Sequence, residues 1–199
     1  MYVPKHFSVP EQDRITSFIH ENGFGDLISQ VDNSPFVTHL PFLFDAASNN
    51  LRGHIAKANP QWQQLDGQQV LVVLWGPHGY ESPGWYSEPG VPTWNYQTVH
   101  VYGTARCIRD PDQLADIVKQ LTNQYEASFA DPWQAEFDNS HSHSIVGISI
   151  AIEEIQCKFK LSQNRSEQER RDVIQQLDEC GNTSLAAAML AELTDRSIN

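Results

Sequence analysis

Short strand-like runs follow one another through the first part of the chain, with turns instead of long helices between them. Residues 25–31, 36–44 and 51–55 are rich in apolar side chains, and residues 32–35 and 47–50 between them are rich in turn-forming residues. Strand-like runs bounded by turn residues are typical of antiparallel sheets. The spacing therefore predicts an antiparallel meander, because parallel strands need a much longer crossover.

Residues 69–75 contain an almost unbroken apolar run, which predicts a strand that is buried on both faces. Further strands are predicted over residues 98–108, 145–152 and 155–161. No strand–helix–strand alternation connects these runs. The sequence therefore predicts a mainly β fold of the α+β class, either a barrel or a sandwich with peripheral helices.

Capping residues, prolines in a first turn and terminal glycines bound the predicted helices. The alanine-rich helix at the end of the chain is expected to form only when it packs on another surface. We expect one domain over residues 1–180 and a helical tail over residues 181–199. The predicted helices span residues 10–22, 59–65, 110–125, 164–180 and 184–193.

Composition and charge exclude several function classes. The net charge of −12 works against unaided binding to nucleic acid, whose phosphates repel an acidic surface. No apolar stretch reaches about 18 residues, so no membrane span is expected, and the N-terminus lacks a signal-peptide pattern. Cys107, Cys157 and Cys180 are widely spaced, which argues against disulfide or zinc frameworks and favours a cytoplasmic location.

Residues 75–96 combine Trp75, Trp85 and Trp94 with several glycines and prolines. Aromatic side chains bury large areas and usually go to a core. A core strand is seldom interrupted so often, because proline removes a ladder hydrogen bond and glycine weakens the strand. Two interpretations stay open: a wall around a planar ligand, and a surface loop anchored by aromatic side chains.

Four polar residues are expected to converge near the start of a short helix. Arg52 and His54 lie on the same face of the predicted strand, and Lys57 and Asn59 follow where the first helical N–H groups have no intrahelical partner. Two cations, an imidazole and a helix N-terminus suit an anion such as a phosphate. A solvated strand edge with incidental charges is the competing interpretation.

A second basic cluster spans residues 158–171. Arg170 and Arg171 fit a solvated helix face, where acidic neighbours can pair with them. The polar corner Ser162-Gln163-Asn164 fits that interpretation less well.

The histidines give weaker signals. His141 and His143, with Asp138, resemble a metal cluster, but the segment is polar and loop-like and no cysteine supports it, so no metal is expected. A haem held by one axial histidine would leave no spacing signature.

A series of motifs over residues 1–178 has an order and spacing typical of one family. It includes Leu51-Arg-Gly-His54, Ala58-Asn-Pro60, Gly76-Pro-His78, Val91-Pro-Thr-Trp-Asn-Tyr96 and Lys160-Leu-Ser-Gln-Asn-Arg165. The series resembles the PaiB-like proteins, which are described as FMN-binding negative transcriptional regulators of bacteria. Gly79, Glu81, Gly84 and Phe159 depart from the usual pattern of that family.

The resemblance implies a split β-barrel of the pyridoxamine-phosphate-oxidase-like kind and a homodimer with FMN at the subunit interface. It assigns the FMN phosphate to the region of Arg52, His54, Lys57 and Asn59, where charge also predicts an anion site. The other cofactor-binding positions that it implies are Trp75, Pro77, Ser82, Trp85, Trp94, Asn95, Lys160, Ser162, Gln163 and Asn164.

Function is less constrained than fold. The resemblance implies a flavin-dependent regulator or sensor, yet the sequence has no helix-turn-helix pattern and its charge opposes direct contact with DNA. A flavin reductase or oxidase stays open, because flavin supplies its own redox chemistry and needs no conspicuous acid or base. A haem-handling split barrel is a more distant alternative.

Overall fold

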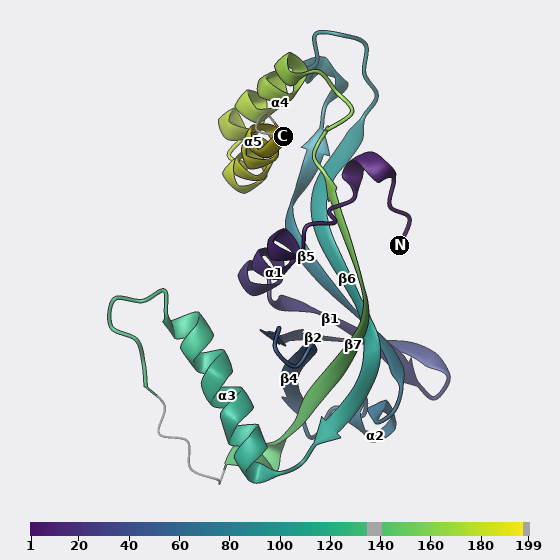
Figure 1. Ribbon diagram of the computed structural model, residues 1–199, viewed down its shortest axis with the longest axis vertical. Coiled ribbons are helices and arrows are strands. Elements are labelled where there is room, and N and C mark those ends of the chain that lie inside the picture. The colour runs from purple at the N-terminus through teal and green to yellow at the C-terminus, as the bar shows by residue number, and fades with distance from the viewer. Residues whose placement is uncertain (135–140, 197–199) are drawn as a thin grey trace. The chain divides into compact units, whose positions relative to one another are not determined.

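The computed structural model describes residues 1–134 and 141–196, except for the side chains of residues 141, 142, 195 and 196 (Figure 1). Within this part of the chain, seven strands form one sheet in the order β2-β1-β5-β6-β7-β4-β3. β1 pairs antiparallel with β2 and β5, and β4 pairs antiparallel with β3 and β7, which confirms the mainly β fold. The strands are β1 (Phe24–Val31), β2 (Ser34–Pro41), β3 (Leu43–Asp45), β4 (Asn50–Ala56), β5 (Gln69–Glu81), β6 (Thr93–Ile108) and β7 (Ile145–Lys160).

The longer helices begin at capped residues. Asp110 accepts a hydrogen bond from the backbone N–H of Gln113 at 3.0 Å before α3, and Ser166 forms a capping box with Glu169 before α4. No helix among the described residues is long and apolar enough to cross a membrane. The helical segments are η1 (Lys5–Phe7), α1 (Gln12–Glu21), α2 (Trp62–Leu65), η2 (Pro83–Trp85), α3 (Pro111–Glu126), η3 (His141–Ser144), α4 (Glu167–Glu179) and α5 (Thr183–Arg196).

Several predicted strand boundaries are wrong. β5 continues to Glu81 and β6 begins at Thr93, so half of the aromatic segment is sheet and residues 82–92 connect the two strands. Pro77 fits inside β5 because the pairing of β5 with β1 ends at Leu74, so proline removes no hydrogen bond to β1 beyond that point.

Other boundaries differ for local reasons. The run predicted over residues 36–44 is divided between β2 and β3, and the two runs predicted over residues 145–161 form the single strand β7. The short helix α2 begins at Trp62 instead of Asn59, because the Asn59 Oδ1 accepts from the backbone N–H of Gln61 at 2.9 Å and stabilises a turn first.

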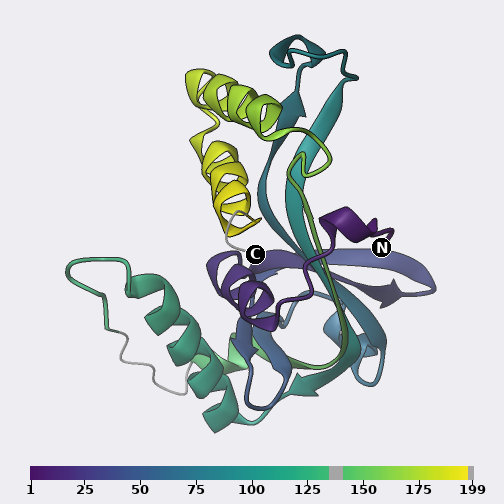
Figure 2. The ribbon, with the colours of Figure 1, turned by 45° about the horizontal axis from the view of Figure 1, so that its top comes forward.

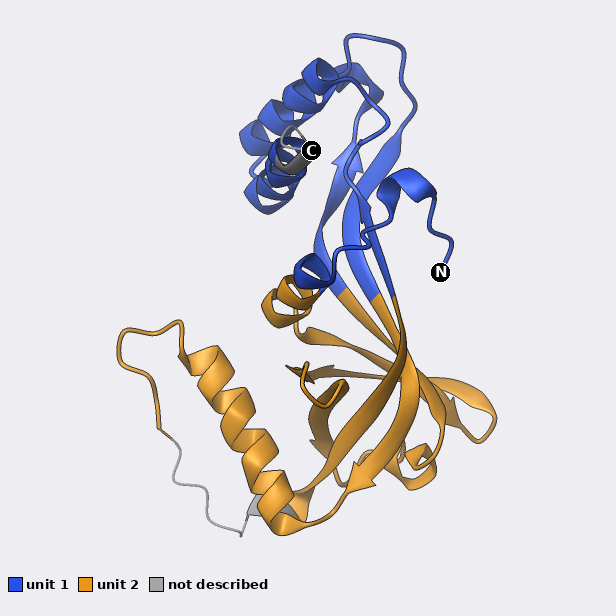
Figure 3. Ribbon diagram, in the orientation of Figure 1, with its two compact units in different colours: residues 1–15, 75–99, 156–199 blue, residues 16–74, 100–155 orange. Residues whose placement is uncertain are grey.

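The described chain divides into two compact units, each built from segments far apart in the sequence (Figure 3). Unit 1 comprises residues 1–15, 75–99 and 156–199, and unit 2 comprises residues 16–74 and 100–155. The strands β5, β6 and β7 contribute residues to both units. The division into a domain over residues 1–180 and a tail stays a prediction.

The core of unit 2 is formed by the sheet and α3. Leu27, Val72 and Ile148 are fully buried on β1, β5 and β7, and Ile117 of α3 packs with Leu43 of β3. Each such side chain contributes about 1.5–3 kcal/mol to stability through its removal from water. These residues come from the predicted strands and from the helix predicted over residues 110–125.

In unit 1, α4 and α5 lie side by side (Figure 2). Leu185, Met189 and Leu193 are spaced by four residues and bury one face of α5. Gly79 of β5 has no side chain where Asn182 and Leu185 approach it, so the start of α5 lies directly against the strand. The alanine-rich helix therefore packs on a surface of its own chain.

The close approach of β6 and β7 in unit 2 depends on Gly103, where an added Cβ would clash with the backbone carbonyl of Ala151. We expect Gly103→Ala to lower the free energy of unfolding by about 1–3 kcal/mol, because backbone atoms cannot move aside cheaply. Gly84→Ala is the matched control, since a Cβ there meets only the Ser82 Oγ at 3.6 Å. Denaturant unfolding of both variants checks this, and equal stabilities would contradict it.

Candidate functional site

The predicted cofactor residues fall into two sets, one in each compact unit. Arg52, His54, Lys57 and Asn59 belong to unit 2, on β4 and the turn before α2. The remaining residues belong to unit 1, on β5, β6, the loop between them, the end of β7 and the corner that follows it. The local geometry of each set shows which side chains are available to a ligand.

On β4, Arg52 and His54 share one face of the strand, as predicted, opposite the buried Leu51. The Arg52 guanidinium donates from Nη1 to Asp116 Oδ2 at 3.2 Å and from Nη2 to Gln120 Oε1 at 2.9 Å, both on α3. Arg52 Nε and His54 Nδ1 are buried, and neither has a hydrogen-bond partner in the described residues. Burial lowers the pKa of His54, which favours its neutral form.

Lys57 and Asn59 differ in how far their side chains are already used. The backbone N–H of Lys57 donates to the Ser144 carbonyl at 2.8 Å, and the Lys57 carbonyl accepts from the Trp62 Nε1 at 2.8 Å. The exposed ammonium of Lys57 has no partner among the residues described. The Asn59 amide donates to Thr38 Oγ1 at 2.8 Å and accepts from the following turn. Lys57 is therefore the available cation, and Asn59 has a structural role.

In unit 1, the carboxylate of Glu81 is completely buried and surrounded by donors. It accepts from the Tyr86 hydroxyl at 2.5 Å, from the Ser162 hydroxyl at 2.9 Å and from the amide of Asn95. The same amide lies 3.4 Å from the Sδ of Met189 on α5. We call these five residues the Glu81 network.

Lys160 is connected to this network through Asn95. Its ammonium donates to Thr93 Oγ1 at 2.8 Å, to the Trp94 carbonyl at 2.6 Å and to Asn95 Oδ1 at 3.4 Å. Burial lowers the pKa of Lys160, the negative charge of Glu81 raises it, and the neighbouring Lys158 lowers it further. The three donors of Lys160 thus hold the start of β6.

The polar corner after β7 is stabilised by its own side chains. Ser162 adopts a left-handed conformation with φ of 59°, and its hydroxyl contacts Glu81. The Gln163 amide accepts from the backbone N–H of Leu161 at 2.7 Å and donates to the carbonyl of Phe159 at 2.6 Å. Asn164 is exposed and keeps its side chain available.

Tyr80 of β5 and Trp94 of β6 lie on the face opposite the Glu81 network. Tyr80 and Trp94 each precede a buried network residue, and their exposed rings meet edge to face at 6.2 Å between centroids. Trp75 is half-exposed on the same β5 strand. One face of this segment is therefore anchored by polar contacts and the other presents aromatic rings, and a wall around a planar ligand stays a prediction.

The loop between β5 and β6 is fixed by contacts around Tyr86. The Arg165 guanidinium lies 4.6 Å from the centroid of the Tyr86 ring, and Gly90 leaves space for that ring. Ser82 caps η2 by accepting from the backbone N–H of Gly84 at 3.3 Å, and Trp85 is half-buried in η2. Tyr86 and Met189 are not among the predicted cofactor residues, because no motif marks a tyrosine or a methionine for contact with a buried carboxylate.

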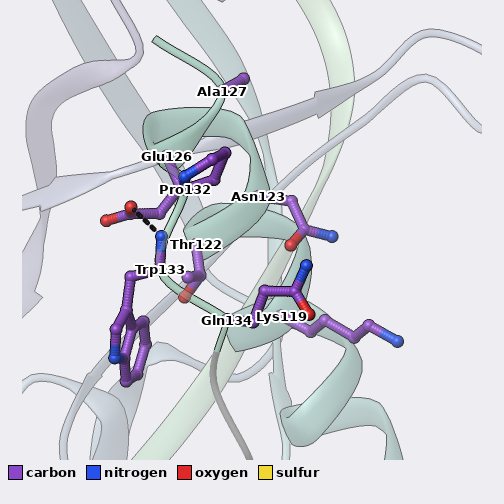
Figure 4. Close-up of a pocket in the computed structure, with 8 residues that line it drawn as sticks. All are labelled: Lys119, Thr122, Asn123, Glu126, Ala127, Pro132, Trp133 and Gln134. Atoms are coloured by element: carbon purple, nitrogen blue, oxygen red, sulfur yellow. Dashed lines mark hydrogen bonds between the residues drawn. The ribbon is translucent and has the colours of Figure 1, made fainter. Parts of the chain in front are cut away.

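A hollow of about 510 Å³ lies beside the second half of α3 in unit 2 (Figure 4). Its walls include Lys119, Glu126 and Trp133, and the backbone N–H of Trp133 donates to Glu126 at 2.7 Å. None of the predicted cofactor residues lines it. Of the residues that resemble a metal cluster in the sequence, His143 is exposed. Asp138 and the side chain of His141 lie outside the described residues.

The family model described as "Putative FMN-binding domain" matches residues 1–154. The protein of Bacillus subtilis (strain 168) named "Protease synthase and sporulation protein PAI 2" is 39% identical over 203 residues, which cover 98% of this chain and 97% of that protein. The likeness therefore extends past the motifs of residues 1–178 into the C-terminal helix. Both findings agree with the resemblance seen in the sequence.

Two solved structures have a similar fold. The flavocytochrome Anf3 from Azotobacter vinelandii matches with a TM-score of 0.67 at 14% identity over 85% of this chain and 78% of that one. The FAD and heme binding protein from Mycobacterium smegmatis matches with a TM-score of 0.64 at 14% identity over 82% and 78%. At this identity the likeness shows the fold alone, and it confirms the predicted split barrel.

The Glu81 network makes a prediction about alkaline pH. Burial, together with the hydrogen bond to Glu81, raises the pKa of Tyr86 to about 12. A group whose pKa rises on folding stabilises the fold fully below its unfolded value, near 10, and loses this contribution as the pH approaches its folded value. We expect the wild type to lose more stability between pH 10 and 12 than Tyr86→Phe, measured by denaturant unfolding. Parallel losses would show that Tyr86 titrates normally.

Proposed function

The chain belongs to the family of FMN-binding domains, and from this membership we propose that it is a flavin-dependent regulator or sensor. The observation that carries the proposal is the match of the family model to residues 1–154, with a sporulation protein 39% identical over nearly the whole chain. Bound flavin would supply the redox chemistry, and the residues of this chain would hold and orient it.

The FMN phosphate is bound by Lys57, with Arg52 and His54 beside it. Support comes from the unpaired Lys57 ammonium and from the two buried nitrogens, Arg52 Nε and His54 Nδ1, that have no partner in the described chain. A phosphate oxygen suits such donors, because charge-assisted hydrogen bonds are the strongest available. Asn59 supports the turn in which Lys57 lies.

The planar ring of the cofactor is assigned to the aromatic side of β5 and β6. The exposed rings of Tyr80 and Trp94 offer a surface for stacking, which suits a flat conjugated ligand. The resemblance also implies Trp75, Pro77, Ser82, Trp85, Asn95, Lys160, Ser162, Gln163 and Asn164 in unit 1, although Asn95 and Ser162 are buried in the Glu81 network.

The proposal also includes a homodimer, a cytoplasmic location and no tight binding to DNA by this protein alone. Exposed Tyr80, Trp94 and Val91 form apolar surface that a second copy would cover. The three cysteines are free thiols in the described structure, which suits a reducing compartment. A charge of −12 disfavours direct contact with DNA phosphates.

A flavin reductase or oxidase would use the same cofactor differently. Such an enzyme would reduce its bound FMN with a nicotinamide nucleotide within the time of one turnover, whereas a regulator needs no such reaction. Stopped-flow absorbance of the FMN-loaded protein mixed with NADH or NADPH separates the two. Rapid reduction would contradict the regulatory proposal.

Removing the proposed phosphate contact tests the site. We expect Lys57→Ala to weaken FMN binding about ten-fold or more, because one charge-assisted hydrogen bond contributes about 1.5–3 kcal/mol. Riboflavin lacks the phosphate, so its affinity should not change. Flavin fluorescence titrations of both ligands measure this, with Lys119→Ala as the control for loss of an exposed lysine in the same unit.

Arg52→Ala gives the companion measurement. We expect a loss for FMN and none for riboflavin, because Arg52 then acts on the phosphate. Equal losses for both ligands would show that Arg52 serves only to hold α3 through Asp116 and Gln120.

Light scattering tests the assembly. We expect the FMN-loaded protein at micromolar concentration to have about twice the chain mass of 22.5 kDa, because the exposed aromatic surface needs a partner. A monomer that still holds FMN would contradict the homodimer.

A further inference from the structure

Glu81 is the most deeply buried ionisable residue within residues 75–96. It is also one of the positions at which the chain departs from the usual pattern of the family. Its carboxylate has no solvent exposure and lies on β5 between the exposed aromatic face and α5. Three donors from three other segments reach it: Tyr86 in the loop, Asn95 on β6 and Ser162 after β7. A buried charge is tolerated only when it is matched by such donors.

The charge of Glu81 decides how the amide of Asn95 is turned. A carboxylate offers only acceptors, so the NH₂ of Asn95 must face it. The Oδ1 of the same amide is then directed to the ammonium of Lys160, at 3.4 Å. The Asn95 amide therefore connects the Glu81 carboxylate to the Lys160 ammonium, and the carboxylate determines which end of the amide faces the ammonium.

Lys160 connects the Glu81 network to the backbone that carries the exposed Trp94 ring. Its ammonium donates to the carbonyl of Trp94 at 2.6 Å and to Thr93 at 2.8 Å, and it lies 5.9 Å from the ring of Phe7. The ring of Trp94 leaves the strand on the opposite side and meets Tyr80. The backbone that carries the exposed ring is therefore held from beneath.

Helix α5 seals the network from water. Met189 contacts the Asn95 amide, and the buried Glu192 accepts from Arg14 at 2.6 Å, which ties the helix to the N-terminal segment. The missing side chain of Gly79 lets Asn182 donate to the His78 carbonyl at 3.1 Å. Exclusion of water strengthens the effect of the Glu81 charge on its neighbours.

We propose that Glu81 is a positioning residue of the flavin site, whose buried charge orients Asn95 and Lys160 and thereby fixes the aromatic surface around Trp94. This rests on the proposed assignment of the flavin ring to that surface. Glu81 itself is not expected to touch a cofactor atom. Helix α5 strengthens the electrostatic effect of Glu81 on its neighbours, because it excludes water from the network.

The first test needs no cofactor. In Glu81→Gln the shape of the side chain is kept and its charge is lost, so the pKa of Lys160 should fall below its wild-type value. Lys160 would then lose its proton at a lower pH, because burial and Lys158 act on it without the opposing charge. NMR titration of isotope-labelled lysine side chains measures this, with Lys160→Arg to assign the signal.

Glu88→Gln is the matched control, because Glu88 is an exposed carboxylate in the same loop. We expect its Lys160 titration to coincide with that of the wild type. A Glu81→Gln protein whose Lys160 titrates as in the wild type would overturn the proposal, whatever its affinity for FMN.

The second test uses ligand binding. Glu81→Gln should weaken FMN and riboflavin binding by the same factor, about ten-fold, because the ring surface and not the phosphate contact is disturbed; such a loss corresponds to about 1.4 kcal/mol. A loss confined to FMN, or no loss, would contradict the positioning role. If the wild type binds neither flavin, the proposed function fails, whereas the Lys160 titration still decides the role of Glu81.

Tyr86→Phe separates charge from packing. It removes one hydrogen bond to Glu81 and leaves the carboxylate with Asn95 and Ser162. We expect the Lys160 titration of this variant to stay near that of the wild type. A shift as large as that of Glu81→Gln would mean that local packing, and not the charge, controls Lys160, and the proposal would be wrong.

Discussion

A buried carboxylate needs donors on every side, and the arrangement of unit 1 follows from that need at Glu81. Tyr86, Asn95 and Ser162 come from three different segments, of which only that of Ser162 is far away in the sequence, and each supplies one donor. Leaving any donor out would cost about 1–3 kcal/mol for an unmatched polar group, and more for a charge. The loop, β6 and the corner after β7 are therefore held in register by one side chain.

In this arrangement the two faces of the β5–β6 strand pair have different roles. One face is closed by α5 and carries the polar network, while the other presents Tyr80 and Trp94 to a ligand or partner. The strict alternation of side chains along a strand allows both tasks within two adjacent residues. In unit 2 the same alternation on β4 separates the core residue Leu51 from Arg52 and His54.

Much of the fold could be predicted from the sequence, because alternation, turn residues and caps are local signals. Pro77 shows where they fail: a proline interrupts a strand only if its N–H faces a partner, and that depends on where β1 stops pairing. The sequence also predicts Arg52 and Lys57 as equals. Only the position of Asp116, sixty-four residues later, reveals that Arg52 is already paired. Glu81 is recognisable in the sequence as a departure from the family pattern. The donors to its carboxylate cannot be predicted there, because only tertiary packing brings them together.

The visible absorbance spectrum of the protein purified without added cofactor shows whether this chain is an FMN protein. We expect the bands of an oxidised flavin, with a chromophore that is released on denaturation and identified as FMN at one per chain. A haem spectrum would show that the chain is not an FMN protein, as would FAD in place of FMN or a colourless protein that stays colourless after incubation with FMN.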